Sequence, residues 1–572
     1  MSGDLVIRNG YVVDGTGRRG RHADVVIDGG IVTAIEPPGS GATAHRTIEA
    51  DGLLVTPGFV DIHTHYDAQA TWDPFLTPSS WHGVTTVVMG NCGVGFAPAA
   101  PDRHEWLIQL MEGVEDIPGS AMTEGITWDW RTYPEYLDAL EARQHVIDVG
   151  SQIAHGPLRA YVMGDRGAAN EVATDDDIEA MAAQVEAGLR AGALGFSTSR
   201  TPLHRSKDGE LVPGTTADAR ELLGVGEAIR RAGHGVFQFA PEHALVPVAE
   251  WPWMRELAAT TGLPVSVNLN QPDSAPEVWR EVLRLLDVAH ADGLPIHAQV
   301  AGRTIGILYC LHGSVHPLMF HPAYIEVAHL PMAERLVALT DPERRRRIVH
   351  DVPDDSGLFE KVVLRHLARM WPVADGDIDY EPTADDSIAA IAARTGVPPM
   401  ELVLDQLLAH DGNGMLYAPF FNYAYGDLSM TYEATLHPHT RMGLSDAGAH
   451  CGAICDGGTP TFMLTHWARD RTRGPQLPLE YVVHRQTQQT ASLYGLGDRG
   501  VLAPGMRADL NVIDFDALRF GPARMAFDLP AQGRRLVQRA QGYRATFVAG
   551  EQTVADDEFT GALPGRLVRG PR

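Results

Sequence analysis

The sequence predicts an α/β fold: a (β/α)8 TIM-like barrel with a small β-sandwich domain built from both chain termini. Three observations predict it. Short apolar segments alternate with helical patterns through the middle of the chain, which is typical of parallel strands covered by helices. Strand and turn patterns of a different kind occupy both ends of the chain. The 572 residues exceed the roughly 250–300 at which a single core usually stops growing, so the chain has room for both parts.

Both ends of the chain show the pattern of short β-hairpins. Residues 4–10 and 23–30 are rich in β-branched residues and close on Asn-Gly and Asp-Gly, the dipeptides that best tolerate positive φ. Residues 508–514 and 544–550 resemble them, with polar residues or glycine at their ends. Chain termini often lie close together, so we expect one small β-domain assembled from both ends.

The middle of the chain repeats a strand, a loop and a helix. Residues 175–191 give the clearest helix, with apolar residues at three- and four-residue spacing behind an acidic first turn. The candidate strands are short apolar runs, as expected for strands buried on both faces. Eight of them, separated by helices, predict a closed barrel. They are residues 58–65, 84–91, 146–155, 193–198, 235–241, 264–270, 295–301 and 442–446.

One segment exceeds a minimal barrel. Residues 304–441 lie between the seventh and eighth candidate strands and contain helical patterns of their own. Loops at the carboxyl ends of barrel strands surround the place where barrel enzymes carry out their chemistry. We therefore expect a long insertion before the last strand that acts as a lid over that place.

Composition and charge exclude several classes of protein. The excess of 73 acidic over 46 basic residues gives a net charge of −27, which repels nucleic-acid backbones. The chain starts without a basic and apolar leader, has no run of 18 apolar residues, and its four cysteines are too few for a disulfide framework. We expect a cytoplasmic protein with neither a nucleic-acid nor a membrane partner.

The strongest chemical signal is the pair His63 and His65 at the end of the first barrel strand. Alternation along a strand places both imidazoles on the same side. Two imidazoles so placed form half of a divalent-metal site, and histidine is a usual ligand of zinc. The alternative, a pair of structural histidines, is disfavoured by the preceding apolar strand, its Pro-Gly lead-in and the following Asp67.

Two further residues end other strands and could complete this site. Asp446 follows the last strand, where it could ligate a metal and take a proton from water whose pKa the metal lowers from 15.7 towards about 7. Cys92 follows the second strand among glycines, and zinc readily takes a cysteine sulfur. A helix-capping aspartate and a buried inert cysteine are the structural alternatives.

These motifs resemble the amidohydrolase superfamily and, within it, the N-acyl-D-amino-acid deacylase (D-aminoacylase) branch. The likeness covers essentially the whole chain and is more specific for the superfamily than for the substrate. It implies a barrel over residues 58–495, including the 304–441 insertion, and a β-domain from residues 1–57 plus 496–572. The segments that carry it are residues 5–15, 57–65, 90–93, 155–159, 163–164, 193–198, 445–448 and 500–510.

The resemblance also implies a metal centre. Most superfamily members with paired metals bridge them with a carboxylated lysine, but the two lysines here, Lys207 and Lys361, end no candidate strand. The D-aminoacylase branch uses a cysteine instead, which Cys92 matches. The implied metal is zinc, with one or two ions per chain, and Asp446 is the implied general base. The implied ligands are His63, His65, Cys92 and Asp446.

The sequence departs from that branch at the fifth and sixth strands, where the branch places one further histidine each. Neither strand here has a histidine in register, and Gln271 aligns with a lysine that the family uses towards the substrate. We therefore favour a single metal ion. We expect Gln238, Asn268 and Asn270 to hydrogen-bond the substrate instead.

Three further residues follow other strands. His155 and Arg159 come after the third strand and could serve the oxyanion or the surroundings of the metal, or have a purely structural role. Arg303 follows the seventh strand, where its guanidinium could bind a substrate carboxylate with two parallel hydrogen bonds, a geometry that lysine does not offer. An ion pair with the insertion is the alternative for Arg303.

The sequence therefore predicts a metal-dependent hydrolase of a non-peptide C–N amide bond, with an N-acyl-D-amino acid as its small-molecule substrate by analogy. An amidohydrolase acting on another amide, a cyclic amide or an ester is the alternative within the same class. A non-catalytic binding or scaffold protein on this fold is the alternative from another class. The sequence leaves open the acyl group, the stereochemical preference and the oligomeric state, a homo-oligomer included.

Overall fold

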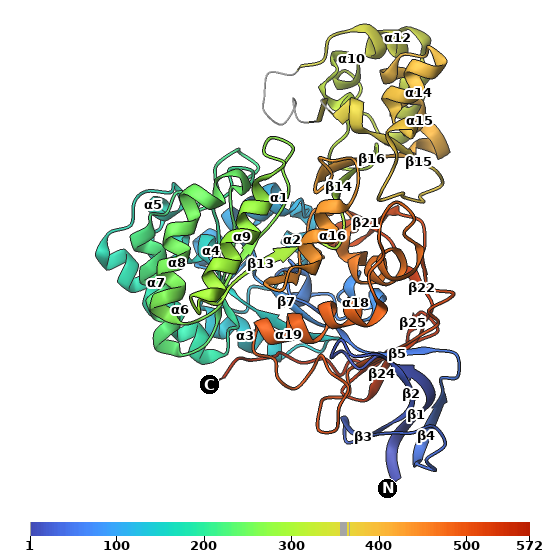
Figure 1. Cartoon of the computed structure of the whole chain (residues 1–572). Helices are drawn as coiled ribbons and strands as arrows, with labels where there is room; N and C mark the ends of the chain where they lie inside the picture. Colours follow the sequence, from blue (N-terminus) through green and yellow to red (C-terminus); the bar gives the residue numbers. More distant parts are fainter. Residues whose placement is uncertain (1, 355–362, 365, 572) are drawn as a thin grey trace.

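The computed structural model describes residues 2–354, 363–364 and 366–571, and it confirms a mixed α/β fold (Figure 1). Parallel strands and their helices form the body, the N-terminal strands lie at one end, and a mainly helical segment lies at the other. Lys361 falls outside the described residues. Within the described part of the chain, every helix is too short or too polar to cross a membrane.

The body is built from parallel strands that follow one another in chain order. They are β6 (Phe59–Asp61), β7 (Val84–Met89), β8 (Asp148–Ser151), β9 (Ile153–Ala154), β10 (Gly195–Ser199), β11 (Val236–Ala240), β12 (Val265–Asn268), β13 (Ile296–Val300) and β17 (Thr440–Met442). β6 to β8 form one sheet, and β9 to β13 with β17 form a second, separated only by Gln152. A parallel bridge from Thr64 to Ala447 links the segments that follow β6 and β17. Each predicted strand segment overlaps at least one of these strands. Residues 146–155 hold both β8 and β9, and the last predicted segment, 442–446, shares only Met442 with β17.

Burial and capping explain these elements. Every residue of β7 and of β10 to β13 is buried, as the apolar runs predict for strands covered on both faces. The predicted helix over 175–191 is present with these bounds; Thr174 and Asp177 form its capping box, and Gly192, at φ 116°, ends it. The helices of the body are α1 (His104–Glu115), α2 (Gly119–Gly125), α3 (Tyr133–Glu141), α4 (His155–Met163), α5 (Asp165–Ala168), α6 (Asp175–Ala191), α7 (Ala219–Ala232), α8 (Trp251–Thr261), α9 (Val278–Ala291), α16 (Ser429–Leu436), α17 (Thr459–Phe462), α18 (Leu479–Gln486) and α19 (Gln488–Leu493).

Strands from both chain ends share one nine-stranded sheet. They are β1 (Ser2–Val12), β2 (Arg21–Asp28), β3 (Ile31–Glu36), β4 (Thr43–Glu49), β5 (Leu54–Pro57), β18 (Leu510–Ile513), β23 (Tyr543–Val548), β24 (Glu551–Ala555) and β25 (Glu558–Phe559). β18 joins the two ends, because it pairs with β5 on one side and β23 on the other. The sheet buries an apolar core of its own, to which both ends contribute.

Part of the C-terminal segment lies outside this sheet, and the assignment of residues 496–572 to the β-domain stays a prediction. β19 (Arg519–Phe520) pairs with β22 (Ala540–Gln541), and β20 (Arg524–Leu529) pairs with β21 (Gly533–Val537). The backbone N–H of Leu536 donates to the carbonyl of Cys451, so the β20–β21 hairpin lies against the loop after β17. Farther on, Leu567 bridges Val149 of β8.

The segment between β13 and β17 has its own sheet and its own apolar core. Its antiparallel strands are β14 (Ile305–Tyr309), β15 (Trp371–Val373) and β16 (Met415–Phe421), and its helices are α10 (Pro322–Ile325), α11 (Met332–Thr340), α12 (Pro342–His350), α14 (Ile388–Thr395) and α15 (Pro399–Gly412). Figure 1 shows these helices clustered at the end of the molecule opposite β1 to β4. α16 packs against β13 and β17, so the last part of the predicted 304–441 insertion belongs to the body.

Candidate metal centre

Three of the predicted ligands form one cluster, and Asp446 lies beside two of them. The ligand atoms of His63, His65 and Cys92 lie within 4.8 Å of one another, and all three residues are buried. His63 Nε2 lies 3.2 Å from Cys92 Sγ and 3.3 Å from Asp446 Oδ1, which is 3.7 Å from His65 Nε2. Ligands that hold zinc in a tetrahedron, at about 2.0–2.3 Å from the ion, are separated from one another by roughly 3.3–3.8 Å. The three separations here are of about this size, and two nitrogens, one sulfur and one carboxylate oxygen are ligand types that zinc takes.

The backbone between the first and last strands of the body places Asp446 opposite the two histidines. The Asp446 N–H donates to the His63 carbonyl at 3.1 Å, and the His65 N–H donates to the Ala447 carbonyl at 2.8 Å. Leu444 and Asp446 both have positive φ, of 58° and 46°. Non-glycine residues held in this conformation cluster at functional sites. The turn aims the Asp446 carboxylate at the imidazoles instead of continuing β17.

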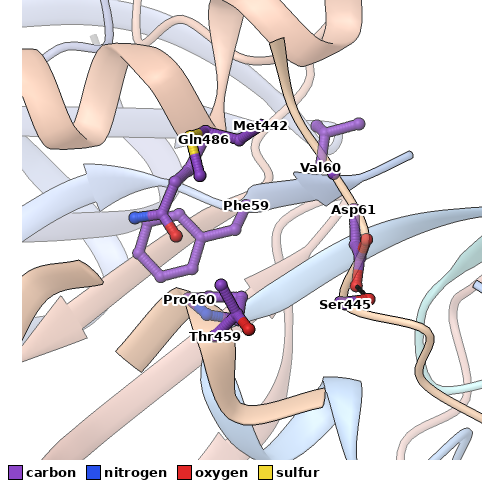
Figure 2. Close-up of a pocket in the computed structure, with 9 residues that line it drawn as sticks. Phe59, Val60, Asp61, Met442, Ser445, Thr459, Pro460 and Gln486 are labelled. Atoms are coloured by element: carbon purple, nitrogen blue, oxygen red, sulfur yellow. Dashed lines mark hydrogen bonds between the residues drawn. The ribbon is translucent and has the colours of Figure 1, made fainter. Parts of the chain in front are cut away.

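A small cavity lies between β6 and β17 (Figure 2). Phe59 and Gln486 line it, and in it Ser445 Oγ donates to Asp61 Oδ2 at 2.6 Å. Its volume of about 30 Å³ holds a water molecule but not an amide substrate. The cavity is therefore separate from the place where a substrate meets the metal ligands.

Cys92 is presented by a tight turn after β7. Its φ is 54°, and its N–H donates to Gln238 Oε1 at 2.9 Å. A side chain on Gly93 would come within 2.6 Å of the Ser199 nitrogen of β10, so only glycine fits there. The preceding Gly90 N–H donates to the Asp67 carboxylate at 3.1 Å. The glycines that made Cys92 stand out in the sequence thus let the turn approach the neighbouring strand.

The charges of these groups support one another. Burial alone would raise the pKa of Cys92, but the neighbouring imidazole of His63 lowers it below its usual value. Burial would lower the pKa of His63, but Cys92 raises it. Burial would also raise the pKa of Asp446, yet the neighbouring His65 and the charge of both imidazoles lower it. These shifts bring Cys92 closer to the thiolate and keep Asp446 a carboxylate, the forms that bind a cation.

A second residue lies on the far side of each imidazole. His63 Nδ1 donates to Gln299 Oε1 at 2.7 Å, and Gln299 Nε2 in turn donates to Ser266 Oγ at 3.0 Å. His65 Nδ1 lies 3.3 Å from Glu115 Oε1. Alternation along β13 gives a signal for Gln299, because every second residue of the strand faces the same side. The sequence prediction missed Glu115, which ends α1 within no recognisable motif.

Gln238 and Asn268 lie beside Cys92. Asn268 Nδ2 donates to Cys92 Sγ at 3.6 Å, and Gln238 Nε2 donates to Asn268 Oδ1 at 2.9 Å. The two amides therefore form a short chain that leads from the backbone of the cysteine back to its sulfur. Their role in substrate binding stays a prediction.

Asn270 lies farther along the same loop and contacts the insertion. Its Nδ2 lies 3.3 Å from His243 Nε2, and its Oδ1 accepts from Asn422 Nδ2 at 3.1 Å. The neighbouring Gln271 N–H donates to Asn422 Oδ1 at 2.7 Å, and the Asn422 N–H donates to the Gln271 carbonyl at 3.1 Å. Asn422 follows β16, so this loop holds the insertion in place.

The structure does not bring His155 and Arg159 to the metal ligands; their side-chain contacts are with Glu221 of α7 and its surroundings. His155 Nε2 lies 2.9 Å from Glu221 Oε1, and Arg159 pairs with the same oxygen. Arg159 and Glu221 are both 1% exposed. Burial would raise the pKa of Glu221, but His155 and Arg159 lower it to about 2. The contacts support the structural alternative for both residues.

The guanidinium group of Arg303 also contacts other residues of the protein. It is 1% exposed, and its guanidinium donates to Asp456 Oδ1 at 3.0 Å and to the Cys455 carbonyl at 2.7 Å. It also lies over the ring of Tyr380, 3.7 Å from the ring centroid. The predicted contact with a substrate carboxylate gains no support from this packing. Asp456 lies in the loop after β17, so the ion pair is not with the 304–441 segment.

Comparison with known proteins gives full-length matches. The sequence profile described as "Amidohydrolase family" matches residues 46–554. D-aminoacylase of Alcaligenes xylosoxydans xylosoxydans is 27% identical, and the alignment covers 99% of this chain and 97% of that protein. N-acyl-D-aspartate deacylase of the same organism is 28% identical over 99% of this chain and 95% of its own length.

A solved structure has the same overall fold. N-acyl-D-glutamate deacylase from Bordetella bronchiseptica, complexed with zinc and a phosphonate inhibitor, superposes with a TM-score of 0.65 at 23% identity, over 100% of both chains. At this level of identity the likeness bears on the fold alone.

Proposed function

This chain belongs to the amidohydrolase family, and from that premise we propose that it hydrolyses the amide bond of N-acyl-D-amino acids with the help of one bound zinc ion. The D-aminoacylase and the N-acyl-D-aspartate deacylase that it resembles over nearly its whole length support the substrate class. The observation that carries the proposal is the buried cluster of His63, His65 and Cys92, with the Asp446 carboxylate beside both imidazoles.

Asp446 is the group that moves the proton. A zinc ion held by these ligands would polarise the acyl carbonyl and lower the pKa of water. The lowered pKa of Asp446 keeps its side chain ionised, and this carboxylate is the group placed to accept a proton from the attacking water. The side chain remains 17% exposed, so substrate and water can reach it. The same carboxyl group then delivers the proton to the amine that leaves.

The neighbouring residues keep the site in one arrangement. Gln299 accepts from His63 Nδ1, which leaves the His63 Nε2 lone pair directed at the site. Ser266 accepts from the Gln299 amide and so fixes which way that amide points. Proton transfer and carbonyl polarisation both depend on such fixed geometry, because a misplacement of about 1 Å can cost 10²-fold in rate.

We favour one ion per chain. Zinc is held in proteins by cysteine, histidine and carboxylate side chains, and amides do not belong to this set. The amides of Gln238 and Asn268 are engaged with Cys92 and with each other, next to the ligands. They suit hydrogen bonding to Cys92 and to a substrate better than the binding of a second cation.

We also infer that the two parallel sheets are parts of one (β/α)8 barrel with a lid. The chain order of β6 to β13 and β17, and the bridge between Thr64 and Ala447, support closure of the barrel. The contacts of Asn422 with Asn270 and Gln271 support a lid, because they hold the insertion against a loop at the carboxyl end of β12.

The proposed function predicts stereoselective, metal-dependent hydrolysis. Purified protein is loaded with zinc and given matched pairs of N-acetyl-D- and N-acetyl-L-amino acids, and the released amine is measured. We expect hydrolysis of the D forms in preference to the L forms, its loss on chelation and its return when zinc is restored. Zinc-loaded protein that cleaves neither form would contradict the proposal. Cleavage of cyclic amides or esters alone would show that the proposed substrate class is wrong.

A further inference from the structure

We propose that Glu115 is a positioning residue of the metal centre: its carboxylate holds His65 in the orientation and tautomer that direct Nε2 at the metal. This inference rests on the proposed metal-dependent function and extends it to a residue of α1. It follows from the contacts of Glu115 with two histidines and with the loop that carries Asp446.

The carboxylate of Glu115 is buried between two imidazoles. The residue is 1% exposed, and Oε1 lies 3.3 Å from His65 Nδ1 while Oε2 lies 3.7 Å from His450 Nε2. A carboxylate removed from water is costly unless it is paired. The arrangement therefore needs at least one imidazole to present an N–H to Glu115, and His65 is the nearer.

The tautomer of His65 follows from this contact. Glu115 Oε1 lies 3.3 Å from His65 Nδ1, which otherwise has no hydrogen-bond partner in the described structure, so a proton on Nδ1 is the arrangement that this contact favours. Nε2 then keeps its lone pair and lies 3.7 Å from Asp446 Oδ1, on the side of the other ligands. His63 has a neutral partner in the corresponding position, because its Nδ1 donates to Gln299. The two ligand histidines thus have different second partners, one charged and one neutral.

Glu115 is itself anchored to the loop that carries Asp446. The His450 N–H donates to the Glu115 carbonyl. The next residue, Asp116, has a φ of 52°, and its Oδ2 accepts from the Gly452 N–H at 2.9 Å and from Ser314 Oγ at 2.5 Å. Glu115 and Asp116 at the end of α1 therefore connect His65 to the loop that carries Asp446.

Zinc affinity tests this role without any use of catalysis. Apo protein is titrated with zinc against a chromophoric chelator, for the wild type and for Glu115→Ala and Glu115→Gln. Loss of a residue that orients a ligand typically weakens metal binding by about 10–100-fold. We expect Glu115→Ala at the upper end of this range and Glu115→Gln at the lower end, because a glutamine oxygen can still accept from Nδ1 but carries no charge.

A matched control lies on the same helix. Glu112 is 29% exposed and pairs at the surface with Lys207, so Glu112→Gln should bind zinc as the wild type does. The visible spectrum of the cobalt-substituted protein gives a second readout, since a changed ligand geometry at His65 shifts its bands. Should Glu115→Ala fail to fold, Glu115→Gln carries the test.

The results separate this proposal from the proposed function. Wild-type affinity, within threefold, in both Glu115 variants would overturn the positioning role even if the enzyme hydrolyses N-acyl-D-amino acids. Weakened affinity in both variants, with an unchanged Glu112 control, supports the role even if the wild type cleaves none of those substrates.

Discussion

Replacement of His63 by alanine is expected to abolish hydrolysis together with zinc binding. The imidazole is one of the four proposed ligands, with Cys92 Sγ and Asp446 Oδ1 at 3.2 and 3.3 Å from its Nε2. A catalytic metal contributes several kcal/mol to the reaction, and each 1.36 kcal/mol is tenfold in rate. We therefore expect kcat/KM for an N-acyl-D-amino acid to fall by at least about 10³-fold. Zinc content, measured by plasma mass spectrometry after dialysis, should fall towards zero.

His437→Ala is the control for a general effect of losing a histidine. His437 lies before β17, at the end of this strand opposite Asp446, and pairs with Asp287. This variant should keep both zinc and activity. A His63→Ala protein that is folded, free of zinc and as active as the wild type would show that hydrolysis needs no metal at this site.

Asp446→Asn should separate proton transfer from metal binding. Asparagine keeps the size of the side chain and an oxygen at its tip, but it cannot accept the proton of the attacking water. A positioned general base contributes about 10²–10⁴-fold, so kcat should fall by that factor while the protein folds normally. The rate is measured at saturating substrate with zinc in excess, so that any weakening of zinc binding is compensated.

A second aspartate near the site provides the comparison. Asp67 accepts from the Gly90 N–H beside the cysteine turn and makes no direct contact with Asp446 in the described structure. Asp67→Asn should therefore lower kcat far less than Asp446→Asn. Equal losses in the two variants would mean that the effect comes from disturbance of the site and not from loss of a base.

The sequence predicts most of the body of the fold because its signals are local. Most strands of the body are short and buried, β10 for example at every residue, and α6 carries a capping box and an amphipathic pattern of its own. The β20–β21 hairpin against the loop after β17 could not be predicted, because its position depends on contacts between distant segments. For example, a hydrogen bond joins the backbones of Leu536 and Cys451, and no local sequence pattern predicts it.

The residues of the candidate site also differ in whether the sequence alone reveals their role. His63, His65, Cys92 and Asp446 stand out because each follows a strand, and parallel strands bring their carboxyl ends together. Arg159 and Arg303 also follow strands, but sequence cannot reveal that Glu221 and Asp456 occupy their guanidinium groups. Glu115 reaches His65 from the end of a helix, across fifty residues of chain. Only the three-dimensional structure reveals these partners, because Glu221, Asp456 and Glu115 lie far from the strand ends in the sequence.

A crystal structure of the zinc-loaded protein, with anomalous scattering measured on both sides of the zinc absorption edge, tests the convergence of these side chains most directly. We predict one anomalous peak per chain, at about 2.0–2.3 Å from His63 Nε2, His65 Nε2, Cys92 Sγ and an Asp446 oxygen. A zinc-loaded crystal with no peak among these four residues, or with its zinc held by other side chains, would contradict the account.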